Sequence, residues 1–159
     1  MAKSQKLGND FSLAYSRGLT AWKLRELHWA WAPKPMHAMV LRLHGEPVAV
    51  ARTFPRLLSN KDIRIPVMGI GGVFVERENR RQGLARLVVA ATCQRLQQDR
   101  VLAACLYSTD QYKWLYRGLG FEEVQPGFMV KPLVPGVEFT PLEFPLIVEP
   151  WGIEPNGHF

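Results

Sequence analysis

The segment from residue 63 to residue 98 constrains the fold more than any other part of the chain. Its first thirteen residues form a long apolar run with Pro66 near the start and glycines inside, which predicts a buried strand with a bulge or a close backbone approach. A polar turn, Glu76 to Gln82, separates this strand from a helix that runs from Gly83 to about Gln98. Leu84, Leu87, Val88 and Ala91 form the apolar stripe of that helix. The segment therefore predicts a strand, a turn and a helix in an α/β protein.

The start of this helix has the features of an anion site. The backbone N–H groups of a first helical turn have no partner within the helix, and together with the helix dipole they attract negative charge. Gly83 has no Cβ that would block a phosphate, and three arginines lie nearby, namely Arg80, Arg81 and Arg86. No Gly-Lys-Ser/Thr follows, as a P-loop requires, and G-x-G-x-x-G is absent. The alternative is an ordinary connection with arginines on the surface.

The remaining segments predict an α/β fold with a mixed sheet and a hairpin before it. Thr20 can cap a helix to about Trp31, because Pro33 and Pro35 prevent its continuation. Thr109 or Asp110 can cap a second helix that glycines at 118 and 120 end. Strands are predicted at 39–43, 48–54, 101–107, 121–124, 128–131 and 144–148, with a loop at 55–62.

Composition limits the class of protein. A chain of 159 residues with 47% hydrophobic and 21% charged residues suits one globular domain and excludes general disorder. Two cysteines exclude a disulfide scaffold, and the histidines are too scattered for a metal site, so no metal is expected. No signal peptide or membrane-spanning run is visible, so we expect a cytoplasmic protein that does not enter membranes.

Charge is distributed unevenly along the chain. Residues 132–159 hold four glutamates, no Lys or Arg, and six of the 12 prolines, whereas the first 131 residues carry all 20 Lys and Arg against 10 acidic residues, a net +10. A basic body suits a polyanionic partner, either nucleic acid or a phosphate-rich cofactor, or it is simply a solvated surface. Because the tail is also rich in large apolar residues, we expect it to be ordered against the body or a second copy of the chain.

The turn before the helix predicted from Gly83 resembles a known loop. Arg80-x-x-Gly83-x-Ala85 is similar to the Arg/Gln-x-x-Gly-x-Gly/Ala loop of the GNAT acyltransferase superfamily, which grips the acyl-CoA pyrophosphate. The resemblance implies that the stretch Arg80, Arg81, Gln82, Gly83, Leu84 and Ala85 binds acetyl-CoA. It also implies that the backbone of Val73, Phe74 and Val75 pairs with the pantetheine arm and helps to polarise the thioester carbonyl.

A second match lies about thirty residues further on. Leu115 to Phe121 resembles the family's Leu/Phe-Tyr-x-x-x-Gly-Phe element, and the resemblance as a whole covers roughly residues 39–131. It implies a GNAT-like mixed, mostly antiparallel central sheet flanked by helices, formed by residues 1–131, with 132–159 as an acidic, Pro-rich extension. The sequence departs from the family pattern at Ala85, where many members have glycine, and at Thr109, where many have Asn; Thr109 is still expected at the cofactor.

Tyr116 is the first candidate catalytic residue. The matching tyrosine of the family protonates the departing CoA thiolate, although Tyr116 also lies on the apolar stripe of its predicted helix and could simply pack there. The attacking amine must lose a proton, and Glu76 is the candidate base closest in sequence to the family's catalytic strand. The other candidates are Glu78, Asp110, His28, His37 and His44.

Three functions from different classes remain. The first is transfer of an acetyl group from acetyl-CoA to a primary amine of a small molecule or peptide by direct attack. The second is a nucleic-acid-modifying protein, in which the basic body contacts phosphates and the tryptophans stack on a base. The third is a non-catalytic acyl-CoA-binding module. Trp29 and Trp31 line an acceptor groove, belong to the core, or face a partner in a homodimer.

Overall fold

The computed structural model describes residues 4–7, 11–19, 36–59, 64–136 and 147–150. The helix predicted from Thr20 to Trp31, with Trp29, Trp31 and His28, lies outside these residues. The chain divides into two compact units, of which the first comprises Met1–Thr53 and Gly72–Arg95 and the second Phe54–Gly71 and Leu96–Phe159. Among the described residues, no helix is both long and apolar enough to cross a membrane.

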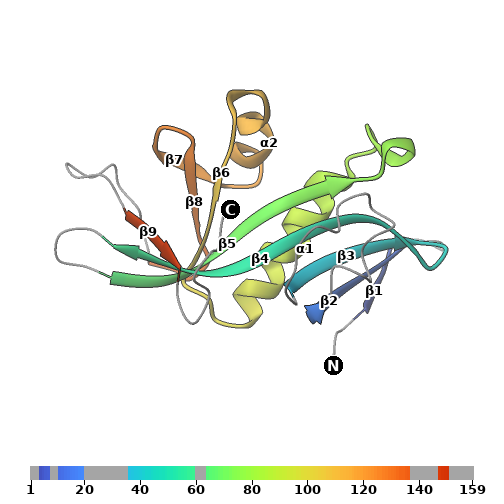
Figure 1. The fold of residues 1–159 in the computed structure, drawn as a ribbon, viewed down its shortest axis with the longest axis horizontal. Coiled ribbons are helices and arrows are strands. Elements are labelled where there is room, and N and C mark those ends of the chain that lie inside the picture. The colour runs from blue at the N-terminus through green and yellow to red at the C-terminus, as the bar shows by residue number, and fades with distance from the viewer. Residues whose placement is uncertain (1–3, 8–10, 20–35, 60–63, 137–146, 151–159) are drawn as a thin grey trace. The chain divides into compact units, whose positions relative to one another are not determined.

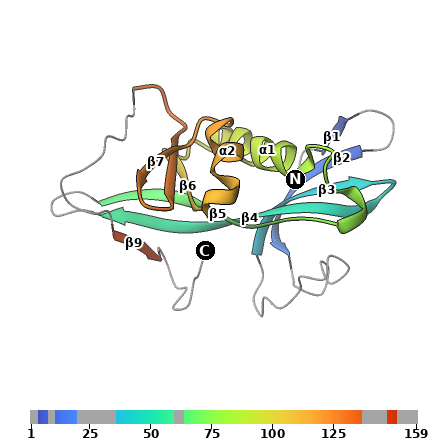
Figure 2. The same cartoon turned by 90° about the horizontal axis from the view of Figure 1, so that it is seen from above.

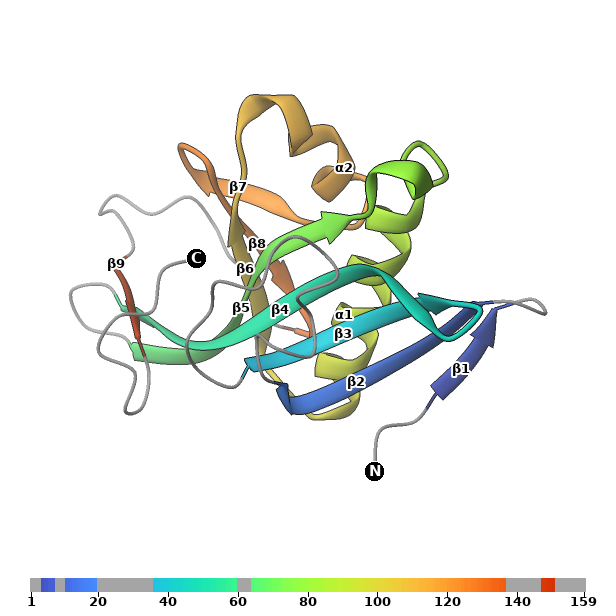
Figure 3. The same cartoon turned by 45° about the vertical axis from the view of Figure 1, so that its right-hand side comes forward.

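The first unit is an antiparallel sheet with a helix. Its strands are β1 (Ser4–Leu7), β2 (Phe11–Leu19), β3 (Met36–Leu43) and the first half of β4 (Glu46–Ser59), each antiparallel to the next (Figure 3). The end of β5 (Arg64–Val75) and most of α1 (Leu84–Gln98) complete the unit. Helix α1 lies along one face of these strands (Figure 2). The fully buried residues include Val40, Leu41, Val50, Val88 and Val89.

The predicted hairpin is confirmed. Strands β3 and β4 pair from Leu43 and Glu46 onward, and two residues with positive φ connect them, His44 at 50° and Gly45 at 83°. Two left-handed residues are what a tight hairpin turn with the natural strand twist requires. The strands are longer than the alternation of the sequence predicted.

The second unit forms the mixed part of the fold (Figure 1). Strand β6 (Ala103–Tyr107) is parallel to β5 through Met68 and Ala104, and antiparallel to β8 (Phe128–Pro132). Strand β7 (Glu122–Gln125) forms a hairpin with β8, as predicted, and β9 (Ile147–Pro150) is antiparallel to the end of β4. The core cluster contains Leu58, Val67, Ala103, Cys105, Phe128 and Val130. Mixed, mostly antiparallel pairing with helices matches the predicted fold class.

Three local predictions were wrong in detail. The expected loop at 55–62 is strand up to Ser59. Strand β4 is hydrogen-bonded to β5, and its end also pairs with β9, from Arg56 opposite Pro150 to Ser59 opposite Ile147. The second helix is short: a 3₁₀ turn at Asp110–Tyr112 precedes α2 (Lys113–Arg117). Thr109 is the N-cap of that turn, but its side chain makes no capping hydrogen bond.

The tail is described in part. Strand β9 begins at Ile147, three residues after the start of the predicted strand, and Phe144 lies outside the described residues. The packing of the extension 132–159 as a whole remains a prediction.

Candidate functional site

The peptide group between Val75 and Glu76 is held at both ends. Its N–H, on Glu76, donates to the carbonyl oxygen of Val48 on β4 at 2.8 Å. Its carbonyl, on Val75, accepts a hydrogen bond from Nε of Arg80 at 2.9 Å. The strand therefore ends in a fixed orientation, and the 3₁₀ turn Arg77–Asn79 begins directly after it.

The loop after that turn is built from unusual backbone angles. Arg81 and Gly83 have φ values of 64° and 76°, which are left-handed conformations. The carbonyl of Gly83 accepts the hydrogen bond of the Leu87 N–H at 3.1 Å, so Gly83 is the first residue to accept a bond from α1. The N–H groups of the next residues consequently belong to the open first turn of a 15-residue helix.

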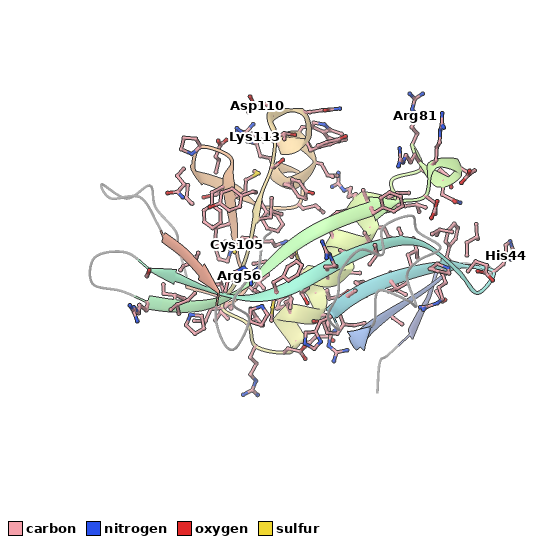
Figure 4. The ribbon with its side chains drawn as sticks, in the orientation of Figure 1. His44, Arg56, Arg81, Cys105, Asp110 and Lys113 are labelled. Carbon is pink, nitrogen blue, oxygen red and sulfur yellow. The ribbon has the colours of Figure 1, made fainter. Side chains whose placement is uncertain are left out.

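Side chains leave this first turn accessible. A Cβ built on Gly83 would meet no atom within 4 Å, so the space in front of its backbone is open. The side chain of Leu84 is only 8% exposed and anchors the helix to the core, whereas Gln82 and Arg86 are exposed. The Arg81 side chain points outward from the loop (Figure 4). An anion could approach the backbone here without displacing a side chain.

Glu76 is the candidate base with an unusual environment. The side chain is half-buried, and its Oε1 atom is buried with no hydrogen-bond partner within the described part of the chain. Leaving a buried acceptor unsatisfied costs about 1–3 kcal/mol, so such an atom needs an explanation. By contrast, Glu78 and Asp110 are exposed, as is His44 at the hairpin tip. The Nδ1 atom of His37 is also buried without a hydrogen-bond partner there.

Tyr116 lies in the second unit, on α2. Its ring meets that of Phe121 edge to face, with 5.9 Å between centroids, and its carbonyl accepts hydrogen bonds from the N–H groups of Leu119 and Phe121. Burial, and to a smaller extent the nearby Tyr112, raise the pKa of the Tyr116 phenol above its usual value. The phenol is therefore protonated throughout the physiological range, as a proton donor must be.

Thr109 and Tyr112 are both exposed on the same segment. The backbone carbonyl of Thr109 accepts the N–H of Tyr112 at 3.0 Å and the hydroxyl of Ser108 at 2.9 Å. The Thr109 hydroxyl makes no capping hydrogen bond to the 3₁₀ turn that it precedes.

An ion-pair cluster around Glu123 was missed by sequence reasoning. Its Oε1 accepts from Nζ of Lys113 at 2.8 Å and from the N–H of Gly127 at 3.0 Å, and its Oε2 accepts from Arg117 at 3.1 Å. Lys113 also pairs with Asp110 at 2.6 Å (Figure 4). The spacing of Lys113 and Arg117 places both on one helical face, which was the available signal.

A buried arginine was also missed. Arg56 is 1% exposed, stacks on Phe54 with its Cζ 5.1 Å from the ring centroid, and donates to the carbonyl of Pro55 at 2.7 Å. Burial raises the pKa of the nearby Cys105 thiol to about 12, and the charge of Arg56 lowers it only in part. Cys105 is thus a protonated core residue (Figure 4). Among the described residues, no three His, Cys, Asp or Glu side chains gather as metal ligands would.

The structure divides the predicted site residues between the two units. The stretch from Val73 to Ala85, with Glu76 and the loop arginines, belongs to the first unit, and Thr109 and Tyr116 belong to the second. Within the first unit, the peptide group between Val75 and Glu76 is hydrogen-bonded to Val48 and to Arg80.

Comparison with known proteins gives one family and several similar folds. The family model described as Acetyltransferase (GNAT) domain matches residues 15–124, more than half of the chain. No curated protein matches the sequence.

Among solved structures, a GNAT family acetyltransferase from Brucella melitensis in complex with acetyl-CoA shares 15% identity at a TM-score of 0.62, over 87% of this chain and 94% of that one. The GNAT family N-acetyltransferase YhbS from Escherichia coli in complex with CoA shares 18% sequence identity at a TM-score of 0.59, over 84% of this chain and 89% of that one. A mutant of the toxin AtaT bound to acetyl-CoA and to the C-terminus of the antitoxin AtaR shares 10% sequence identity at a TM-score of 0.61, over 79% of this chain and 94% of that one.

Proposed function

Because the chain belongs to the family of GNAT acetyltransferase domains, we propose that it transfers an acetyl group from acetyl-CoA to a primary amine. The observation that carries this proposal is the backbone of the loop, with Arg81 and Gly83 left-handed at the open N-terminus of α1. Acetyl-CoA supplies the activated acetyl thioester. Similar folds with acetyl-CoA or CoA bound, from Brucella melitensis and Escherichia coli, support the choice of donor.

The loop fits a pyrophosphate at the level of its backbone. Two left-handed residues turn successive N–H groups toward one side, and the helix dipole adds to their positive potential. A Cβ at residue 83 would occupy space that is otherwise open, which explains a glycine there. We assign the loop from Arg81 to Ala85 to the pyrophosphate, and Thr109 to a polar contact with the same ligand.

The end of β5 would orient the thioester. In an extended strand, the N–H and the C=O of one residue point to the same side, and those of the next residue point to the other. Glu76 directs its N–H to Val48 on β4, so Val75 directs its N–H and C=O away from β4. By the same alternation, Val73 also faces away from β4, whereas the intervening Phe74 faces it. We therefore assign the N–H and C=O groups of Val73 and Val75 to the pantetheine arm and the carbonyl oxygen.

Proton transfer would involve two side chains. Glu76 accepts the amine proton through a water, which its buried and unsatisfied Oε1 would also bind. The amine nitrogen forms a bond to the acetyl carbon, the carbon–sulfur bond breaks, and the Tyr116 phenol gives its proton to the sulfur. The raised pKa keeps that phenol protonated until it is needed.

The acceptor is a small molecule or a peptide with a primary amine. One similar fold, the toxin AtaT, is bound to the C-terminus of a protein partner, so protein and peptide partners belong in the test. We propose residues 1–131 as the catalytic domain, and a homodimer through the extension as one possible assembly.

The test measures free CoA release from acetyl-CoA with a panel of small amines, amine-bearing peptides and nucleic acids. With an acceptor in hand, we expect Tyr116→Phe to lower the rate about 10²–10⁴-fold at nearly unchanged acetyl-CoA affinity, the range of general acid catalysis. Tyr112→Phe is the matched control, since its ring lies on the same segment and is 51% exposed.

Two results would contradict the proposal. Acetyl-CoA binding without transfer to any acceptor would favour a binding module. Release that requires nucleic acid and falls steeply with salt would favour the nucleic-acid-directed function. An unchanged rate in Tyr116→Phe would remove the acid role but leave the transfer itself.

A further inference from the structure

We propose that Arg80 is a positioning residue, whose guanidinium fixes the end of strand β5 rather than holding a phosphate. This inference rests on the proposed function, because the strand end matters through the thioester it would orient. It concerns a residue that the sequence motif assigns to the pyrophosphate. The side-chain geometry points elsewhere.

The first argument is the direction of the Arg80 side chain. Its Nε donates to the Val75 carbonyl at 2.9 Å, five residues earlier in the chain. Its Cζ lies 5.6 Å from the centre of the Phe74 ring, within the range of a cation–π contact. The guanidinium is thereby attached to two consecutive residues of the strand. A phosphate contact through the same Nε would require this hydrogen bond to break.

The second argument is the contrast between neighbours. Arg80 has an extended backbone, with φ −71° and ψ 162°, whereas Arg81 is left-handed at φ 64°. This change of conformation sends consecutive side chains in different directions. Arg80 lies back over the strand, and Arg81 points outward (Figure 4). Of the two, Arg81 is the arginine that is positioned to meet an approaching anion.

The third argument concerns the strand conformation that the hydrogen bond from Arg80 to the Val75 carbonyl controls. The Val75–Glu76 peptide is fixed by Val48 on one side and by Arg80 on the other. The Val75 N–H belongs to the preceding peptide, between Phe74 and Val75, and it points to the same side as the Val75 carbonyl only while Val75 is extended. Fixing the carbonyl holds Val75 in that extended conformation. Arg80 would thus keep the Val75 N–H directed toward the thioester, without touching the thioester itself.

A donor without phosphates separates the two roles. We would compare acetyl-CoA with S-acetyl-N-acetylcysteamine, a thioester that ends before the pyrophosphate, for wild type, Arg80→Met and Arg81→Met. Methionine keeps an apolar stem but loses the charge and the donor. We expect Arg80→Met to lower kcat about tenfold or more with both donors, the usual weight of a charge-assisted hydrogen bond. Arg81→Met should raise KM for acetyl-CoA and leave the short donor unaffected.

An exchange measurement makes the test independent of turnover. In Arg80→Met, we expect the Glu76 N–H to exchange with deuterium faster than in wild type, and in Arg81→Met at the wild-type rate. Arg77→Met removes a third charge near the loop, and it should change neither the kinetic constants with the two donors nor the exchange rate of the Glu76 N–H.

The outcomes distinguish the inference from the proposed function. A wild-type protein that transfers acetyl groups from neither donor defeats the proposed function, and the exchange rates then still decide whether Arg80 holds the strand end. An Arg80→Met defect that disappears with the short donor, or unchanged Glu76 exchange, overturns the positioning role.

Discussion

The loop from Glu76 to Ala85 and the turn from Thr109 to Gly127 hold their functional groups in different ways. In the loop, the groups that we propose for the ligand are backbone amides, set by left-handed Arg81 and Gly83 and by the anchored Val75–Glu76 peptide. In the turn, the proposed group is the Tyr116 phenol, on a five-residue helix whose Lys113 and Arg117 bond to Glu123. Backbone conformation therefore dominates in the loop, and side-chain charges dominate in the turn.

This difference determines which changes each region can tolerate. Apart from the arginines whose roles are proposed above, we expect a site made of backbone N–H groups to tolerate most side-chain substitutions. We expect it to be sensitive to changes at Gly83, which leaves open space beside its backbone. A short helix cannot be stable alone, so α2 depends on contacts made by its side chains and on the chain around it. Charge and pH should therefore affect the turn, and steric changes the loop.

The largest effect should come from removing the chain that follows the turn. After β8, Leu133 is 5% exposed and its N–H donates to the carbonyl of Leu102 at 2.9 Å, and β9 then pairs with β4. We expect truncation after Lys131 to cost several kcal/mol of unfolding free energy, since burying one leucine contributes about 1.5–3 kcal/mol. Thermal and denaturant unfolding would measure it.

Truncation after Gly136 is the control, because it retains Leu133 and removes β9. It should cost less than the longer truncation. A protein shortened after Lys131 that melts at the same temperature as the full chain, and has the same oligomeric state in solution, would contradict an ordered extension. A gain of salt-sensitive DNA binding would then favour an acidic tail that screens the basic body.

The next effect tests the conformational side of the comparison. We expect Gly83→Glu to abolish stabilisation by acetyl-CoA, which at a hundredfold excess over Kd should amount to about 2.7 kcal/mol in the wild type. The new side chain brings bulk and negative charge to the open face of the first turn. The readout is the shift of the unfolding midpoint with acetyl-CoA.

Gly45→Glu is a matched control for backbone strain. Gly45 has φ 83° and, like Gly83 at 76°, nothing within 4 Å of an added Cβ. Both variants should lose similar intrinsic stability, but only Gly45→Glu should retain the ligand shift. An equal shift in Gly83→Glu and wild type would remove the loop from the ligand site.

The loop was readable from the sequence because its determinants are local. An apolar run that ends in a basic turn and a glycine predicts strand, turn and helix without tertiary information, and α1 begins one residue after the predicted position. The family match agrees with that interpretation. What the sequence did not reveal is the use of the Arg80 side chain, since a motif gives the residue type but not where the guanidinium points.

The turn was predicted less well, because distant residues determine it. Thr109 was expected to cap a regular helix by local propensity, but its side chain makes no capping bond and a 3₁₀ turn precedes a short α2. The Glu123 contacts instead hold this segment against the β7–β8 hairpin. Similarly, the end of β4 has β5 as one neighbour and β9, about ninety residues later, as another, and the local sequence does not reveal such a distant partner.

The smallest expected effect is on thermal stability, and it tests whether side-chain charges hold the turn. The hydrogen bond from Lys113, followed by that from the Gly127 N–H, holds the pKa of Glu123 below its usual value. A carboxylate whose folded pKa is depressed adds stability above its unfolded pKa, about 4.3, and that stability is lost as the pH falls through the folded value. Conversely, the hydrogen bonds to Asp110 and then Glu123 raise the pKa of Lys113, so its contribution disappears only at high pH.

Glu123→Gln should therefore melt slightly below wild type at pH 7, and the difference should shrink as the pH falls below about 4. Glutamine keeps an oxygen for the Gly127 N–H and removes only the charge. Glu122→Gln is the control, because the neighbouring carboxylate is exposed on the same strand and should give wild-type melting at every pH. We expect acetyl-CoA to stabilise both variants as much as wild type, since the ligand site proposed in the loop does not use Glu122 or Glu123. A Glu123→Gln variant with wild-type melting throughout would show that the charge of Glu123 does not stabilise the turn.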